Sequence, residues 1–496
     1  MRASGILMPV FSLCSKYGIG TLGKEAFNFV DFLAKAGQKY WQILPIGITG
    51  FGDSPYQSVS AFAGNPYFID LDLLVKDGYL KEKDFKFLDF GKNPDRIDYE
   101  SLYKNRYKVL RKAFTVFKSD IPSDFYTFQK ENSYWLENYS LFVAIKDYHN
   151  GDPFSCWEEP FLKMDRECIN NFKEEYKTEL LFNQMIQYFS FKQWFALKDY
   201  ANKKGVMIIG DMPIYVALDS GDVWSNPNEY QLDKNFKPKR IAGVPPDAFS
   251  KDGQLWGNPL YNWKAMKENN YSWWTLRLSH SAKLYDVVRI DHFRAFSAYF
   301  SIPYGDKTAK NGKWVKGPGK GFFQAMKNSL GELNIIAEDL GTIDDDVRKL
   351  LKFTGFPGMK VLQFAFDPND ESSYLPHNLC KNCITYTGTH DNDTLMGFMK
   401  DGDKKSVEFM KKYFNISDNE GFNWGVIKGA MASVADTVIF QMQDFLGLDN
   451  SARINTPATC CNNWQWRIGE GCINDWLAKI IREYTELYYR TEKKRK

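Results

Sequence analysis

The sequence predicts an α/β fold in which parallel strands form a barrel, and three observations support this. Short apolar runs that end in polar or acidic residues recur along the chain, and stretches with apolar residues at helical spacing separate several of them. Such alternation is typical of repeated strand–helix units and a parallel sheet. Three of the runs also lead directly into acidic motifs, which is where a parallel barrel carries catalytic side chains.

The predicted strands are seven apolar runs, in chain order 40–46, 206–211, 285–291, 335–338, 359–366, 384–387 and 436–440. The interval between Glu338 and Asp391 fits two strand–helix units, so the run 359–366 would be the middle strand. Residues 1–496 are therefore expected to form a single catalytic barrel unit with insertions.

Three intervals are too long for plain barrel units. Residues 70–200 are expected to form a helical subdomain, because 126–147 and 172–198 have helical apolar spacing and no internal proline. Residues 219–263 are rich in Gly, Pro and Asn and are expected to be a long ordered loop. Residues 302–333 are expected to be a mobile loop region, since 305–321 is rich in Gly and Lys.

The overall composition excludes several classes of protein. With 25% charged residues and a net charge of only +3 over 496 residues, the chain lacks the basic footprint of a nucleic-acid-binding protein. No apolar run approaches the length of a membrane span. The apolar stretch 5–11 is short, contains Pro9 and has no cleavage site after it, so it does not indicate a secretory signal.

The eight cysteines are expected to be reduced thiols. A zinc site could be drawn from Cys380, Cys383, Cys460 and Cys461. Adjacent cysteines rarely ligate one metal ion, and the second pair has the wrong spacing, so no metal is expected.

The acidic motifs are Arg289-Ile-Asp-His292, Ala337-Glu-Asp-Leu-Gly341 and Thr389-His-Asp-Asn-Asp393. Cleaving a glycosidic bond with retention needs one carboxylate as nucleophile and a protonated carboxyl as acid. A third carboxylate can stabilise the distorted sugar. The three motifs supply one candidate each.

Asp291, at the end of a predicted strand, is the candidate nucleophile. Arg289 lies two residues earlier and therefore on the same strand face, where a guanidinium would keep the carboxylate ionised and oriented. The same two residues could equally form a structural ion pair at a strand end.

Glu338 is the candidate general acid and base, a role that needs a raised pKa. Asp339 competes for this role, because strand alternation sends one of the two side chains into the site and the other toward the barrel wall. The residues alone leave this choice open.

Asp391 is the third carboxylate, with His390 beside it and Asp393 two residues later. His-Asp-Asn-Asp also resembles a metal-ligand cluster. Hydrogen bonding to sugar hydroxyls explains the same residues without an ion, and the chain has only five histidines and no second His-rich motif.

Two further segments could complete a pocket or be purely structural. Asp211 is another carboxylate at a strand end, and the turn 53–57 presents the ring of Tyr56 beside the hydroxyl group of Ser54.

Taken together, these motifs resemble those of the amylomaltases, also called 4-α-glucanotransferases or disproportionating enzymes. They form glycoside hydrolase family 77 in the α-amylase clan. The resemblance spans nearly the whole chain, through the stretches 4–7, 17–20, 52–57, 64–67, 211–216, 242–247, 253–259, 452–455 and 463–467, together with the acidic motifs.

The resemblance implies a TIM (β/α)8 barrel with mainly helical insertions and a lid loop, around residues 245–254, over the C-terminal face. It implies Asp291 as nucleophile, Glu338 as acid and base, and Asp391 as stabiliser, so it decides between Glu338 and Asp339. The substrate-binding residues are then Tyr56, Ser54, Asp211, Arg289 and His390 around the donor sugar, and Trp256, Gln254, His292 and Asn463 toward the acceptor.

Three positions depart from the usual family pattern. Ala248 stands where a tyrosine is common, Ile454 where a methionine is frequent, and Ala458 where a glycine is frequent. The first would weaken stacking on the acceptor.

The expected activity is transfer of an α-1,4-glucan segment to the 4-hydroxyl of another glucan or of glucose. The alternatives are an α-amylase-type hydrolase that uses the same carboxylates and a non-catalytic glucan-binding protein, which would give no reason for a complete acid set. The expected partners are maltooligosaccharides or other α-1,4-glucans, with no nucleic acid, membrane, cofactor or metal. The resemblance further implies a cytoplasmic protein, and a monomer or homodimer is expected.

Overall fold

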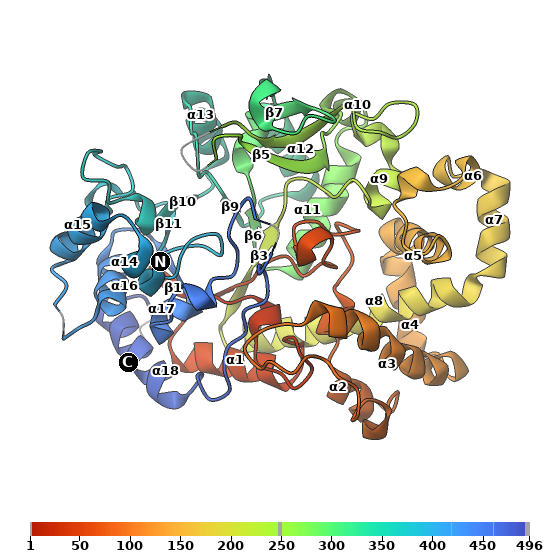
Figure 1. Cartoon of the computed structure of the whole chain (residues 1–496), viewed down its shortest axis with the longest axis horizontal. Coiled ribbons are helices and arrows are strands. Elements are labelled where there is room, and N and C mark those ends of the chain that lie inside the picture. The colour runs from red at the N-terminus through yellow and green to blue at the C-terminus, as the bar shows by residue number, and fades with distance from the viewer. Residues whose placement is uncertain (1, 247–249, 418, 460, 492–496) are drawn as a thin grey trace.

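Eight parallel strands close into a barrel at the centre of the structure, a computed structural model that describes residues 2–246, 250–417, 419–459 and 461–491 (Figure 1). Around the barrel each strand pairs with its neighbours in chain order, and the last strand pairs with the first. The predicted α/β barrel is therefore confirmed. Its strands are β1 (Ala3–Leu7), β2 (Tyr40–Gln42), β3 (Met207–Met212), β6 (Val287–Ile290), β9 (Ile335–Ala337), β10 (Gly358–Val361), β11 (Cys383–Tyr386) and β12 (Thr437–Gln441).

The first barrel strand, β1, was not among the seven predicted strands. It has only five residues, and Ser4 and Gly5 interrupt its apolar pattern, yet all five are buried. Gly5 allows close packing against β2, because an added Cβ would lie 2.6 Å from the carbonyl oxygen of Tyr40. β1 pairs with β2 on one side and with β12 on the other, so it completes the barrel.

Helices follow most barrel strands and form an outer ring. α1 contacts both α8 and α18, and α12 contacts both α11 and α13. α13 shows why such segments fold this way, because it buries Val347 and Leu350 while its charged residues stay in solvent. The ring helices are α1 (Lys24–Lys35), α8 (Lys177–Lys203), α11 (Ser272–Leu284), α12 (Gly319–Leu330), α13 (Asp345–Thr354), α14 (Leu395–Asp401), α15 (Lys404–Phe414), α16 (Phe422–Ala432), α17 (Met442–Leu446) and α18 (Asp475–Leu487).

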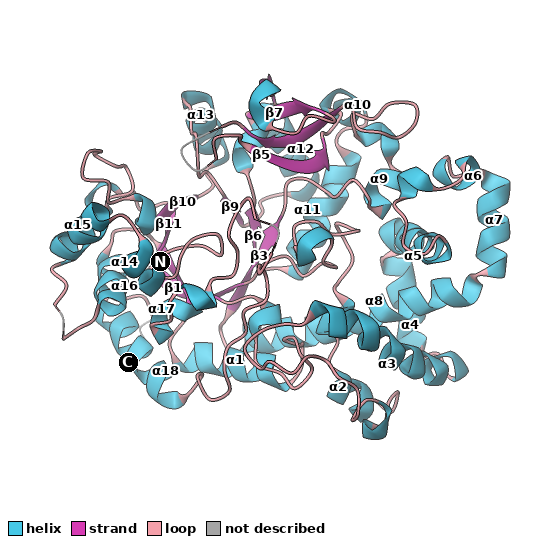
Figure 2. Ribbon diagram, viewed as in Figure 1, coloured by secondary structure: helices cyan, strands magenta, loops and turns pink. Residues whose placement is uncertain are grey.

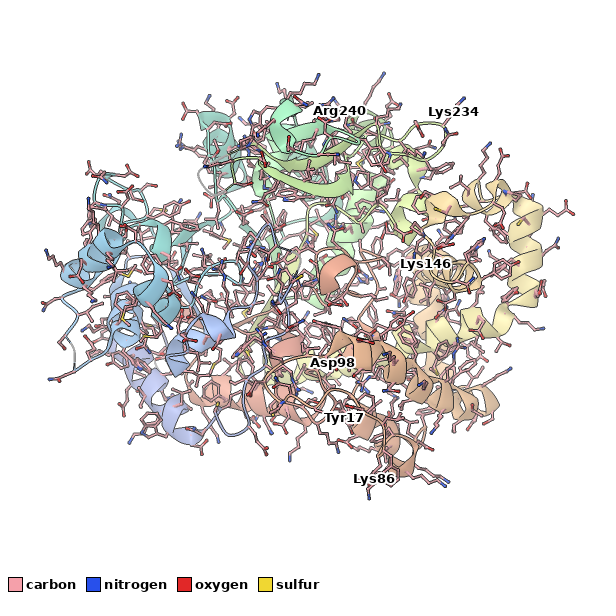
Figure 3. The ribbon with its side chains drawn as sticks, in the orientation of Figure 1. Tyr17, Lys86, Asp98, Lys146, Lys234 and Arg240 are labelled. Atoms are coloured by element: carbon pink, nitrogen blue, oxygen red, sulfur yellow. The ribbon has the colours of Figure 1, made fainter. Side chains whose placement is uncertain are left out.

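A group of helices between β2 and β3 extends from one side of the barrel, at the right of Figure 1. Each of the two helical stretches predicted there is divided, at Asn132 and at Tyr176. The labelled Lys146 of α5 lies in this group in Figure 3. Its members are α2 (Leu71–Lys76), α3 (Tyr99–Ser119), α4 (Ser123–Glu131), α5 (Ser133–Tyr148), α6 (Glu159–Leu162), α7 (Arg166–Glu175) and the start of α8.

A second, four-stranded antiparallel sheet lies at the top of the view in Figures 1 and 2. Its order is β5-β4-β7-β8, with β4 (Arg240–Val244), β5 (Gln254–Pro259), β7 (Ala298–Pro303) and β8 (Lys313–Lys316). The segments 219–263 and 302–333, for which the sequence predicted loops, contribute β4, β5, β8 and part of β7, as well as α9 (Gly221–Ser225) and α10 (Trp263–Glu268). Residues 247–249 of the predicted lid, including Ala248, lie outside the described residues.

None of the helices within the described ranges is long and apolar enough to cross a membrane.

Candidate active site

The three acidic motifs lie at the C-terminal ends of barrel strands. Asp291 directly follows β6 and Glu338 directly follows β9, while Asp391 belongs to the loop between β11 and α14. Because all barrel strands are parallel, these ends share one face of the barrel. The negative charges of Glu338 and Asp391 both act on the carboxylate of Asp291. The structure therefore brings the three predicted carboxylates into one site.

Arg289 links two carboxylates of this site. It is the register partner of Asp211 across the β3–β6 pairing, so both side chains start from the same level of the barrel. Its Nη1 atom lies 2.6 Å from each carboxylate oxygen of Asp211 and 3.2 Å from Oδ1 of Asp291. The predicted pair of Arg289 and Asp291 is present, but the shorter contacts of the guanidinium are with the fully buried Asp211.

Tyr56 and His390 extend this network across the barrel mouth. The Tyr56 hydroxyl donates to Oδ2 of Asp211 at 2.8 Å and lies 2.9 Å from Nε2 of His390. Since the hydroxyl proton points to Asp211, Nε2 of His390 must carry a proton and donate to the hydroxyl oxygen. The two rings also stack, with centroids 5.4 Å apart and an angle of 16° between their planes. Burial raises the pKa of Tyr56 well above its usual range and lowers the pKa of His390, so both groups stay neutral.

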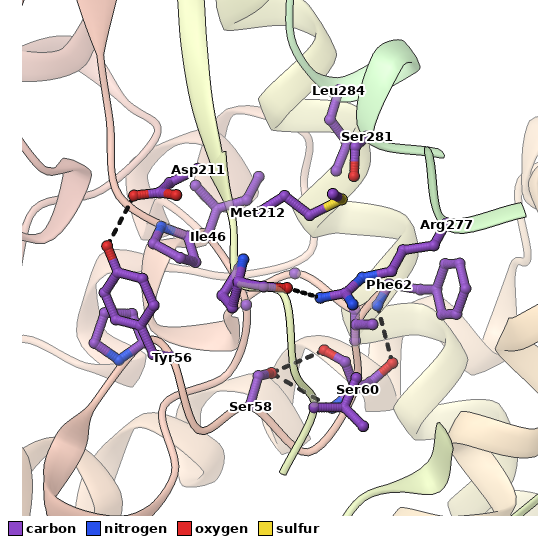
Figure 4. A pocket seen from close by; sticks show the side chains of 18 of the residues that line it. Ile46, Tyr56, Ser58, Ser60, Phe62, Asp211, Met212, Arg277, Ser281 and Leu284 are labelled. Atoms are coloured by element: carbon purple, nitrogen blue, oxygen red, sulfur yellow. Dashed lines mark hydrogen bonds between the residues drawn. The ribbon is translucent and has the colours of Figure 1, made fainter. Parts of the chain in front are cut away.

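A small cavity lies in the wall beside the contact between Tyr56 and Asp211. Its volume is about 60 Å³, and Figure 4 shows Tyr56 and Asp211 on one side and Arg277 on the other. Arg277 is itself occupied, because its Nη1 atom donates to the carbonyl oxygen of Ile214 at 2.8 Å. The cavity therefore belongs to the packing behind the site.

Glu338 and Asp339 point to different partners. The carboxylate of Glu338 accepts hydrogen bonds from the backbone N–H of His292 at 2.6 Å and of Leu340 at 2.8 Å. Asp339 instead accepts from the backbone N–H of Met359 in β10 at 2.6 Å, and its second oxygen lies 3.7 Å from Nζ of Lys360. Asp339 thus joins the end of β9 to β10 in the barrel wall. Glu338 is the member of the pair that lies with Asp291.

Burial governs the acidity of the two candidate catalytic acids. Burial raises the pKa of Glu338, and the charge of Asp339 adds to this rise. The charge of Arg289 and the two backbone N–H groups act in the opposite direction and lower the pKa. Burial also raises the pKa of Asp291, where Arg289 opposes the shift and the charges of Asp211, Glu338 and Asp391 add to it. Both carboxyls are buried and the charge of Glu338 acts on Asp291, so ionisation of Glu338 opposes ionisation of Asp291.

Two residues that sequence reasoning did not assign hold Asp391 in place. Asn455 donates its amide to Oδ1 of Asp391 at 2.6 Å. Arg453 donates to the backbone oxygen of Asp391 at 2.6 Å and also pairs with the carboxylate of Asp393. Both residues lie in the stretch 452–455 that supported the family resemblance. They are more than 60 residues from Asp391 along the chain, so the sequence did not indicate that they contact it.

The residues predicted on the acceptor side fall into two groups. The Trp256 ring of β5 meets the His292 ring edge-on, with centroids 4.8 Å apart, and its Nε1–H donates to Oε1 of Gln254 at 3.1 Å. Burial lowers the pKa of His292 to about 3, so this ring is neutral. The Asn463 side chain is instead engaged in its own loop, where it bonds Thr456 and Thr459.

Ser54 has a local role in the turn that carries Tyr56. Its Oγ atom accepts a hydrogen bond from the backbone N–H of Tyr56 at 3.2 Å, within a turn in which Gly52 and Asp53 have positive φ angles. The neighbouring Gln57 donates to the backbone oxygen of Trp256 at 3.2 Å, which joins this turn to β5.

Chemically, the site combines a carboxylate beside an arginine, a second buried carboxyl of raised pKa, a third carboxylate fixed by an amide, and neutral polar rings. This set matches the needs of retaining glycosidic chemistry. Among the described residues, no group of three or more His, Cys, Asp or Glu side chains is arranged to hold a metal ion. Cys460, part of the zinc site considered above, lies outside the described residues.

Known proteins with similar sequences share one named activity. A family model described as 4-alpha-glucanotransferase matches residues 8–471. The chain is 50% identical to a 4-alpha-glucanotransferase of Clostridium butyricum over 98% of this chain and 100% of that protein. It is 43% identical to the 4-alpha-glucanotransferase of Thermus thermophilus over 95% of each.

Solved structures agree with these sequence matches. The amylomaltase of Streptococcus agalactiae, solved in complex with acarbose, superposes with a TM-score of 0.97 at 41% identity, over 99% of this chain and 100% of that chain. The amylomaltase of Corynebacterium glutamicum, at 18% identity and a TM-score of 0.76, shares the fold over 99% of this chain and 74% of that one.

Proposed function

Since this chain belongs to glycoside hydrolase family 77, the family of the 4-alpha-glucanotransferases, we propose that it transfers α-1,4-glucan segments through a covalent glucosyl-enzyme on Asp291. The donor would be a maltooligosaccharide or another α-1,4-glucan, and the acceptor the 4-hydroxyl of a second glucan or of glucose. The observation that carries the proposal is the gathering of three carboxylates, Asp291, Glu338 and Asp391, at one end of the barrel, with Arg289 beside Asp291.

The first half-reaction uses Asp291 and Glu338 together. Asp291 attacks the anomeric carbon of the donor while the Glu338 carboxyl protonates the departing oxygen. The raised pKa of Glu338 supports this role. Asp391, fixed by Asn455, would stabilise the positive charge that develops on the sugar ring.

The second half-reaction reverses the roles at the same atoms. Glu338, now ionised, removes the proton of the incoming 4-hydroxyl, and the acceptor oxygen displaces Asp291 from the anomeric carbon. Water can take the same place. Sugar is favoured when a binding surface holds it close to the glucosyl-enzyme, and Trp256 beside His292 is the aromatic surface that we assign to this task.

We further propose that the protein works in the cytoplasm as a monomer or a homodimer. The described cysteines are all free thiols, which fits a reducing compartment.

Incubation with maltotriose tests the activity. A transferase converts it to glucose and a ladder of longer glucans with almost no net gain of reducing ends, and Asp291→Asn should abolish both products. A steady rise in reducing ends without longer products would instead identify a hydrolase. Unchanged products from the Asp291→Asn variant would refute the assignment of the nucleophile.

A further inference from the structure

The loop that carries His390 and Asp391 runs from Thr387, just after β11, to Leu395, the first residue of α14. Partners along its length fix its middle. Gln363 and Gln441 both donate to the backbone oxygen of Asp393, at 2.8 and 3.0 Å. Asn450 adds a longer contact at the second end, with the backbone N–H of Thr394 at 3.3 Å, and one residue outside the reacting centre contacts both ends of the loop.

That residue is Asp444 of α17, which follows the neighbouring strand β12. Its Oδ2 accepts the hydroxyl of Thr387 at 2.6 Å, and its Oδ1 accepts the backbone N–H of Leu395 at 2.8 Å. One carboxylate thereby joins the start and the end of the loop and ties both to the adjacent strand–helix unit.

The site is built for a carboxylate although its burial is costly. Asp444 and Thr387 are fully buried, and none of the described groups that shift the pKa of Asp444 is a basic side chain. Burial raises its pKa to about 7, and the two hydrogen bonds oppose that rise. Both loop ends present a donor, and a carboxylate offers an acceptor oxygen to each of them.

We propose that Asp444 is a positioning residue that sets the donor-side geometry of His390 and Asp391 by closing the loop at both ends. This inference rests on the proposed function. Release of either end would leave the middle of the loop held only by side chains from other segments, such as Asn455 and Arg453 on Asp391. His390 and Asp391 could then shift relative to Asp291, which slows both half-reactions. The acceptor surface on β5 would be untouched, so the competition between sugar and water for the glucosyl-enzyme would not change.

The test uses full-length Thr387→Val, which opens one end of the loop at nearly constant volume, and Asp444→Ala, which opens both. With maltotriose, kcat should fall about tenfold for Thr387→Val and about a hundredfold for Asp444→Ala, while the ratio of transfer to hydrolysis stays within about twofold of wild type. Thr387→Ser keeps the hydroxyl and should restore most of the rate. Thermal unfolding of each variant gives the folded fraction used to correct kcat.

Asp403→Asn is the matched control. Asp403 also accepts one backbone N–H and one hydroxyl, both from Ser406, but on the exposed N-terminus of α15. Its variant should keep wild-type kcat. The inference is overturned if Thr387→Val retains kcat within twofold, or if kcat and the transfer ratio fall together. An inactive wild type would instead refute the proposed function.

Discussion

At the scale of single residues, the proposed role of Glu338 as general acid predicts how the rate depends on pH. Glu338 must be protonated to release the leaving group from maltotriose, and burial raises its pKa above the usual value for glutamate. Activity on maltotriose should therefore persist above that usual value and fall as pH rises through the raised pKa. An α-maltotriosyl fluoride donor releases fluoride without a proton, so formation of the glucosyl-enzyme from it should lack this alkaline limb.

The variant Glu338→Gln checks the same assignment. It should lower kcat/KM for maltotriose by at least about a hundredfold. The loss of kcat/KM for α-maltotriosyl fluoride should be much smaller, because fluoride leaves without a proton. Asp291→Asn should be inactive on both donors. An alkaline limb of equal position and depth with both donors would show that Glu338 is not the acid.

Ala458 stands at a position whose family pattern is explained only by the backbone conformation in the structure. The family resemblance noted alanine where glycine is frequent, and the structure places Ala458 at φ 63°. In this left-handed region a Cβ atom is unfavourable, which explains the family's preference. The sequence pattern alone did not decide whether Glu338 or Asp339 is the candidate general acid. The decision needed either the family resemblance or the structure, in which Asp339 accepts the backbone N–H of Met359.

At the scale of elements, β5 carries the aromatic surface that we assign to acceptor binding. Trp256 and Leu255 are adjacent on this strand and point to opposite sides of it, with Trp256 against His292 and Leu255 37% exposed. Trp256→Ala should lower the ratio of transfer to hydrolysis about tenfold, since stacking of a sugar on the ring is lost. Leu255→Ala removes a similar apolar group from the other side and should leave the ratio unchanged.

Product analysis with maltotriose plus glucose measures this ratio directly. If both variants shifted it equally, β5 would act as a simple cover, without a specific aromatic contact.

The elements also show what sequence patterns could and could not predict. Strands that end in an acidic motif, such as β6 and β9, were predicted because an apolar run stops at a functional side chain. β1 was not predicted, because its pairing partner β12 is more than 430 residues away and its composition is mixed. β4 and β5 were not predicted because their Gly, Pro and Asn residues disfavour a strand pattern, and pairing stabilises them instead: β4 pairs with β7 on one side and with β5 on the other.

At the scale of the whole molecule, Arg490 fastens the end of the barrel opposite to the active site. Its buried guanidinium donates to the backbone oxygens of Ala3, Met431, Ser433 and Ala435. Arg490→Met should leave several of these buried carbonyl groups without a donor and lower the free energy of unfolding by about 3 kcal/mol. kcat below the unfolding transition should not change, because the active site is at the other end.

Urea unfolding of the variant provides the measurement, with Arg2→Met as comparison. Arg2 is less buried and contacts two of the same groups, the backbone oxygens of Ser433 and Met431, so its loss should cost less. Equal losses for the two variants would contradict the central role given to Arg490.

The pairing of β1 with β12 also determines how early the barrel can close during biosynthesis. At roughly 5 to 20 residues per second, the ribosome needs about 20 to 90 s after making Ala3 before Thr437, its register partner, exists. During that time β1 has one unpaired edge, and the barrel that aligns Asp291, Glu338 and Asp391 cannot close. The active site can therefore form only after β12 has been made, and until then the edge of β1 that pairs with β12 remains open to other strands.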